Sequence, residues 1–220
     1  ASATPGSSIT FFPWPRAIKG EPGSGEAVAV SFSTPNESFE YWKNRLEEFS
    51  VPHDEAFERF GRKVLPFEDP DGLTLELVFE NTDIDPDQDT NWEGTVETEH
   101  AIKGFWGTTL RLTQEKQTAE ILENILGFSK ADTDGSNSLY TTDAHIGSNV
   151  VIKLTEPKSG KNGRGGIFLS QLVGARPDRR VVVAVFYTAF IVHASVAAVA
   201  GAVANRLVGQ GVAALLVAFA

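Results

Sequence analysis

The sequence predicts an α+β protein in which tandem βαβββ modules pair into a cupped, mixed β-sheet. Three observations support this fold class. Residues 26–80 show the pattern of a strand, a helix and three further strands, and residues 102–155 repeat that order. The two copies start roughly 75–80 residues apart, a spacing typical of duplicated modules rather than of a solenoid. The composition is globular, because 41% of the 220 residues are hydrophobic and 22% are charged.

In the first copy, alternating polarity and frequent Val and Phe predict a strand at Ala27–Ser33. A helix start follows, because Thr34 can cap a helix and Pro35 suits the first helical position. The apolar residues of this helix recur at helical spacing and form one stripe: Phe39, Trp42, Leu46 and Phe49.

Three short strands complete the first copy, at Phe57–Phe60, Lys63–Phe67 and Leu73–Phe79. Side chains alternate along a strand. In the last of the three, one face therefore carries leucines and a phenylalanine, and the other carries Thr74, Glu76 and Val78.

The second copy begins with a strand predicted at Gly107–Leu112. Thr113 can cap the helix that follows, and Gly127 occupies the usual position of a helix stop. Later strands are predicted at Leu139–Thr141 and Asn149–Leu154.

The chain divides into five segments on this pattern. Ser7–Trp14 resembles the last strand of a module that would lie mostly before Ala1, and the absence of methionine also indicates a fragment. The predicted segments are the end of a first module (1–20), a second module (21–80), an acidic linker (81–100), a third module (101–165) and an apolar tail (166–220).

Several stretches resemble a known family. They are TPGSSITFFPWP (4–15), FEYWKNRLEEFSVP (39–52), FEDPDGLTLELV (67–78), AIKGF (101–105) and ENILGF (123–128). Together they are similar to the ring-cleaving extradiol dioxygenases of the vicinal-oxygen-chelate superfamily, in the hydroquinone-cleaving, glyoxalase-like branch. The resemblance implies the glyoxalase/bleomycin-resistance/dioxygenase fold with four modules, of which residues 4–165 match the end of the first, the second and the third.

The resemblance also implies a mononuclear Fe(II), or sometimes Mn(II), that binds O₂ and the two oxygens of a catechol- or hydroquinone-like substrate. Its ligands would be two histidines and one glutamate, from the first strand of module one and from V-H-H-I and L-F-E-I strands of module four. No residue of this chain matches them, since Ile167 follows the glycine-rich stretch where the V-H-H-I strand is expected. We therefore expect no catalytic residue, no bound metal and no activity in this chain.

An alternative function is that of a metal-free binding or scaffolding module. Its ligand would contact Thr74, Glu76 and Val78 in the cup between modules two and three. Glu76 lies at the kind of position where related modules place a metal-binding glutamate. Two simpler interpretations stay open for it: a hydrogen-bonded or solvated strand residue, or an ion pair with Lys153 of the corresponding strand.

Other candidate motifs indicate little chemistry. The chain has no cysteine, which excludes thiolate catalysis and Cys-based zinc sites. None of its histidines is at a ligand position of the family: His53, His100, His145 and His193. The acidic run 83–89 lacks the Gly and Glu spacing of a calcium loop, and Gly160–Gly166 lacks the order of a phosphate-binding loop.

The tail differs sharply in composition. Residues 1–165 hold 28 acidic and 15 basic residues, whereas 166–220 hold four arginines and one acid. The run Val181–Ala204 is uncharged and, as a helix, would be about 36 Å long. We favour a frame-shifted or mis-assigned segment, because the family-like sequence, the lysines and the acids stop together. A membrane helix flanked by arginines and a buried helical hairpin are the alternatives.

Charge and family resemblance also bear on location and partners. A net charge of −10 argues against nucleic-acid binding, which needs a basic face. The acidic body and the soluble relatives favour a cytoplasmic protein without a membrane anchor. Two modules of a four-module fold would expose apolar sheet, so we expect self-association.

Overall fold

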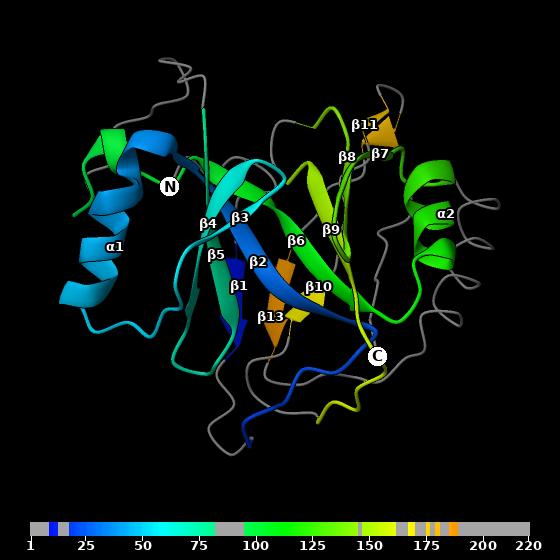
Figure 1. Cartoon of the computed structure of the whole chain (residues 1–220), viewed down its shortest axis with the longest axis horizontal. Coiled ribbons are helices and arrows are strands. Elements are labelled where there is room, and N and C mark those ends of the chain that lie inside the picture. Colours follow the sequence, from blue (N-terminus) through cyan, green and yellow to red (C-terminus); the bar gives the residue numbers. More distant parts are fainter. Residues whose placement is uncertain are drawn as a thin grey trace.

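The computed structural model describes residues 9–12, 18–81, 95–144, 147–161, 167–169, 175–176, 179–180 and 185–188. Two segments of this chain each contain a strand, a helix and three further strands (Figure 1). The first segment comprises β2 (Glu26–Pro35), the 3₁₀ turn η1 (Asn36–Ser38), α1 (Phe39–Glu48), β3 (Phe57–Arg59), β4 (Arg62–Glu68) and β5 (Thr74–Glu80). The second comprises η2 (Thr98–His100), β6 (Gly104–Leu112), α2 (Lys116–Asn124), β7 (Ser129–Asp134), β8 (Asn137–Thr141) and β9 (Asn149–Leu154).

The eight strands of these segments form one mixed sheet in the order β3-β4-β5-β2-β6-β9-β8-β7. The first strands, β2 and β6, pair antiparallel at the centre, and each pairs in parallel with the last strand of its own segment. The order on one side of the centre therefore mirrors the order on the other. This curled sheet confirms the predicted α+β fold of tandem βαβββ units, while the predicted module boundaries stay a prediction.

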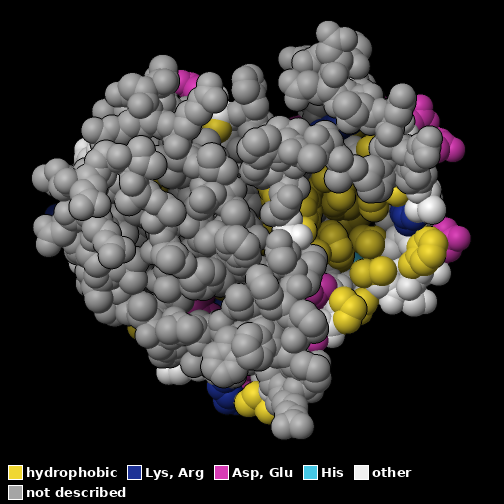
Figure 2. Space-filling model, turned by 180° about the vertical axis from the view of Figure 1, so that it is seen from behind, with side chains coloured by type: hydrophobic (Ala, Val, Ile, Leu, Met, Phe, Trp, Pro, Cys, Tyr) yellow, Lys and Arg dark blue, Asp and Glu magenta, His cyan; other side chains and the backbone are white. Residues whose placement is uncertain are grey.

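The two helices cover the same face of the sheet. Leu46 of α1 packs with Leu65, Leu77 and Phe79 of the first segment. The apolar residues of α2 and the turn after it pack on a larger cluster that includes Val30, Leu110, Tyr140, Val150 and Ile152. Seen from behind, the molecule shows apolar side chains gathered in a hollow of its surface (Figure 2).

The opposite face, which we call the cup face, has an apolar cluster of its own. It consists of Phe60, Val64, Val78, Trp106, Leu139 and Val151, contributed by both segments. Alternation along the strands explains the division, because Val78 lies between Leu77 and Phe79, whose side chains point toward α1.

The predicted helix starts are wrong. Thr34 lies in β2, and its buried hydroxyl has no partner, while the chain enters α1 through η1 after Pro35. The residue preceding α2 is Glu115 rather than Thr113, and neither helix has a side-chain cap. Gly127 does follow α2 with a φ of 77°, which the sequence predicted.

Two details of the strands also differ from expectation. Phe60 belongs to the two-residue turn between β3 and β4 rather than to a strand. β7 was not predicted, because all six of its side chains are exposed and polar or small, so it lacks alternation.

The remaining described strands lie in the terminal parts of the chain. β1 (Ile9–Phe12), β13 (Val185–Thr188) and β10 (Ile167–Leu169) form a sheet in the order β1-β13-β10, and β11 (Ala175–Arg176) pairs with β12 (Arg179–Arg180). Within the run considered as a membrane helix or a helical hairpin, the described part is β13, where the backbone is extended. The rest of that run, His145, His193 and residues 82–94 of the linker lie outside the described residues. None of the described helices is long and apolar enough to cross a membrane.

Candidate functional site

A buried carboxylate lies at the centre of the cup face. Glu76 is 5% exposed, and Arg59 and Ser31 beside it are also buried. The guanidinium of Arg59 donates from Nη1 to Oε1 at 3.2 Å and from Nη2 to Oε2 at 2.7 Å. The hydroxyl of Ser31 donates to Oε2 at 2.6 Å. Both oxygens of Glu76 are therefore occupied by hydrogen-bond donors, and its charge is neutralised by a cation.

The fold brings these three side chains together from three strands. The parallel register of β2 and β5 places Ser31 directly beside Glu76. Arg59 comes from the edge strand β3 and reaches past β4, whose Pro66 is the register partner of Glu76. Arginine suits this bridge because its planar fork matches both oxygens of a carboxylate.

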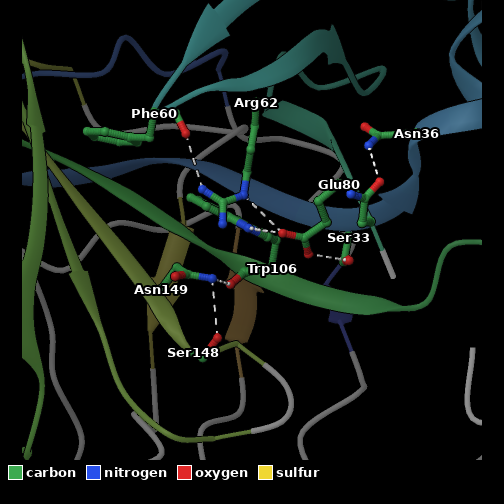
Figure 3. Close-up of polar contacts among 9 residues, drawn as sticks. Ser33, Asn36, Phe60, Arg62, Glu80, Trp106, Ser148 and Asn149 are labelled. Atoms are coloured by element: carbon green, nitrogen blue, oxygen red, sulfur yellow. Dashed lines mark hydrogen bonds and ion pairs between the residues drawn. The ribbon is translucent and has the colours of Figure 1, made fainter. Parts of the chain in front are cut away.

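A second polar network surrounds Glu80 at the end of β5 (Figure 3). Its Oε2 accepts from Nε of Arg62 at 3.1 Å and from Nε1 of Trp106 at 3.2 Å. Its Oε1 accepts from the hydroxyl of Ser33 at 2.7 Å. Arg62 also donates to the backbone carbonyl of Phe60 at 3.3 Å. Arg62 thus neutralises this carboxylate too, but through one contact and in a partly exposed setting.

The apolar cluster fills the space between the two segments on this face. Val78, 1% exposed, separates Glu76 from Glu80 along β5. Phe60 adopts a φ of +52°, which is rare for a bulky residue, and its side chain is buried among residues of both segments. The backbone N–H of Phe60 also donates to Oδ2 of Asp134 at 3.4 Å, which joins the turn after β3 to the end of β7. The cup is therefore packed rather than open at this point.

The three residues predicted to contact a ligand differ from one another in exposure. Thr74 is half-buried, whereas Glu76 and Val78 are enclosed by the contacts just described. Glu76 does form an ion pair, but its partner is Arg59 rather than Lys153, which is exposed on β9. Arg59 was missed because its strand was predicted without its order in the sheet. The signal that could have found it is the pair of consecutive hairpins, β3 with β4 and β4 with β5, which places β3 two strands from β5.

Outside the cup, the described part of the chain brings one group of metal-ligating side chains together: Glu97, Glu99 and His100. The ring of His100 stacks on Tyr41 with centroids 4.1 Å apart, and its Nδ1 lies 3.0 Å from the hydroxyl of Ser38. Glu97 and Glu99 are exposed. This group lies beside α1, and a solvated carboxylate–histidine pair accounts for it.

The metal that the family resemblance implies does not fit the described cup. A site with two histidines and one carboxylate needs free lone pairs that converge on one point. Both carboxylates of the cup network are occupied by arginines, and no described histidine contacts either of them. We therefore assign no catalytic step to a metal here.

The fold and this face define a class of protein: a paired βαβββ domain with a curled sheet and a buried, charge-neutral cup. Comparisons with known proteins narrow that class. No model of a known family matches the chain. The chain is 38% identical over 164 residues to the "Putative ring-cleaving dioxygenase MhqO" of Bacillus subtilis, covering 74% of this chain and 51% of that protein. It is 32% identical over 139 residues to the chlorohydroquinone/hydroquinone 1,2-dioxygenase of Sphingobium indicum, covering 62% of this chain and 42% of that protein.

Comparison with solved structures supports the same relationship. A crystal structure from Bacillus subtilis with 38% identity superposes with a TM-score of 0.66 over 74% of this chain and 51% of that one. The chain therefore belongs to the glyoxalase-like family of ring-cleaving dioxygenases, which confirms the resemblance drawn from its sequence. It spans about half the length of the curated relatives that it matches.

Proposed function

We propose that this chain is part of a metal-dependent dioxygenase that opens the ring of small aromatic substrates of the catechol or hydroquinone kind. The observation that carries the proposal is the 38% identity to a relative named for ring cleavage. The relative named for hydroquinone and chlorohydroquinone supports the substrate class. Fe(II), or else Mn(II), would be the metal, because ring cleavage with O₂ needs a centre that holds substrate and oxygen together.

The described cup would support this activity without holding the metal. Its two carboxylates are neutralised by Arg59 and Arg62, and its centre is filled by Val78, Trp106 and Val151. We infer that the 220-residue chain by itself is inactive and that the ligand residues belong to parts of the enzyme that it lacks.

Oxygen consumption tests this proposal. The untagged chain is loaded anaerobically with Fe(II) or Mn(II) and given hydroquinone, chlorohydroquinone or catechol, with the Sphingobium indicum enzyme as positive control. We expect no metal-dependent oxygen uptake by the chain. Uptake that requires the metal and yields a ring-opened product would overturn its inactivity and would locate a catalytic site within it.

The second candidate is a metal-free binding module that uses Thr74, Glu76 and Val78. Thr74 favours it, because its half-buried side chain leaves the start of β5 accessible. Binding of hydroquinone or benzaldehyde can be followed by ligand-detected NMR. The candidate predicts a signal that Thr74→Val weakens and that Thr98→Val, an exposed control, leaves unchanged. Absence of binding to the folded chain would eliminate this candidate for those probes.

We propose further that the protein is cytoplasmic and self-associates through exposed apolar residues. Phe49 is 62% exposed on the helix-bearing side, and Ile125 after α2 is also exposed. Light scattering across a hundredfold range of protein concentration would detect association. A monomer throughout that range would contradict the self-association.

A further inference from the structure

We propose that Arg59 serves as a built-in cation of the cup, in the place that a divalent metal ion would need at Glu76. The guanidinium neutralises the carboxylate and ties separate strands together, so that this cup closes and stays stable without a metal. The inference concerns the described residues alone and holds whether or not the dioxygenase proposal is correct.

The hydrogen bonds of Glu76 leave little for a metal to bind. An ionised carboxylate offers about four acceptor positions. Arg59 takes one on each oxygen, and Ser31 takes a further position on Oε2. A metal ion would have to displace the guanidinium, and no described histidine lies close enough to Glu76 to act as a further ligand of that metal.

Burial makes this displacement unfavourable. The side chains of Arg59 and Glu76 are 6% and 7% exposed. A buried guanidinium that lost its carboxylate would be left as an uncompensated charge, because it cannot lose its proton. The ring of Phe57 lies 5.6 Å from the guanidinium carbon and covers it further.

The pair also acts on the shape of the sheet. Arg59 is the last residue of the edge strand β3, and Glu76 lies on β5, two strands further in. The bond between them spans β4 and draws the edge over the cup. The next residue, Phe60, then enters the apolar cluster and contacts Asp134 of the other edge strand. Metal ions stabilise many small folds in the same manner, by joining ligands from separate elements at one charged centre.

Metal titration tests the inference on the untagged, chelator-treated chain. Wild type, Glu76→Gln and His100→Ala are titrated with Mn²⁺ and Zn²⁺ by calorimetry. Glutamine keeps an acceptor oxygen for Arg59, and His100→Ala removes binding at the exposed group beside α1. We expect Glu76→Gln to bind each metal as wild type does, within twofold. A loss of tenfold or more in affinity on Glu76→Gln would overturn the inference.

Melting temperatures provide the second arm. Arg59→Met should lower the melting temperature strongly, and Arg59→Met with Glu76→Met should recover a large part of the loss, because no buried charge is left alone. Excess EDTA should not change the melting temperature of wild type. A double variant no more stable than Arg59→Met, or a wild type destabilised by EDTA, would contradict the role given to Arg59. If Arg59→Met does not fold, Arg59→Lys replaces it. Lysine keeps a cation but cannot bridge both oxygens of Glu76, so its melting temperature should be lower than that of wild type, and an unchanged value would contradict the role given to the guanidinium.

Discussion

The two segments of the sheet share one connectivity but differ in the chemistry of their cup faces. The first segment places two arginine–carboxylate pairs there, Arg59 with Glu76 and Arg62 with Glu80. The second segment contributes the apolar side chains of Leu139 and Val151 and the indole of Trp106. Its carboxylate Glu115 lies on the helix side, where it accepts a partly buried hydrogen bond from Tyr140.

This difference shows that repetition of the backbone does not repeat the chemistry. In this chain the first segment supplies both arginine–carboxylate pairs, and the second supplies packing and one hydrogen bond, from Trp106 to Glu80. The face is therefore suited to holding the two segments together, and each prediction below tests one part of that contrast.

The largest effect is expected at the buried pair. Arg59→Met should reduce the free energy of unfolding by about 3–5 kcal/mol, because it leaves the Glu76 carboxylate buried without a cation. Lys153→Met, on the corresponding strand of the other segment, should change it by less than about 0.5 kcal/mol, since Lys153 is exposed. Urea denaturation measures both. Equal losses in the two variants would remove the contrast between the segments.

An intermediate effect is expected at the contact between the segments. Trp106→Phe keeps an aromatic ring in the cluster but removes the Nε1 donor to Glu80. We expect a loss of about 1.5–3 kcal/mol, the usual value for a hydrogen bond to a charged group. Urea denaturation followed by circular dichroism measures it. A loss below about 0.5 kcal/mol would mean that Arg62 and Ser33 alone satisfy Glu80.

The sequence predicts those features of the site that depend on neighbouring residues, and it does not predict contacts between residues far apart in the chain. Alternation placed Glu76 and Val78 on one face of a strand, and the order of elements gave the fold class. The partner of Glu76 depends on the order of the strands in the sheet, and local sequence patterns do not carry that information. Lys153 is a candidate partner because it lies on the strand of the second segment that corresponds to β5, whereas the actual partner, Arg59, lies in the same segment as Glu76. β7 escaped detection because an exposed edge strand carries no hydrophobic alternation.

The smallest effect is expected on the helix side of the second segment. Burial raises the pKa of Glu115, but hydrogen bonds from Tyr140, Lys130 and Ser138 outweigh it and hold the pKa below its usual value. Burial, followed by the contact with Glu115, raises the pKa of Tyr140. The hydroxyl of Tyr140 donates to Oε1 of Glu115 at 2.5 Å. Because the folded-state pKa of Glu115 is lowered, its contribution is present above the unfolded pKa of 4.5 and is lost as the pH falls through the folded value.

Tyr140→Phe should therefore reduce the free energy of unfolding by about 1 kcal/mol at pH 7, through loss of one hydrogen bond. The difference between variant and wild type should shrink below pH 4.5, as the pH falls through the lowered folded-state pKa of Glu115 and the carboxylate becomes protonated in the folded protein. Urea denaturation at pH 7, 5, 4 and 3 follows this change, with Tyr41→Phe as a control on α1. A difference that stays constant down to pH 3 would show that the contribution of the Tyr140 hydroxyl does not depend on the charge of Glu115.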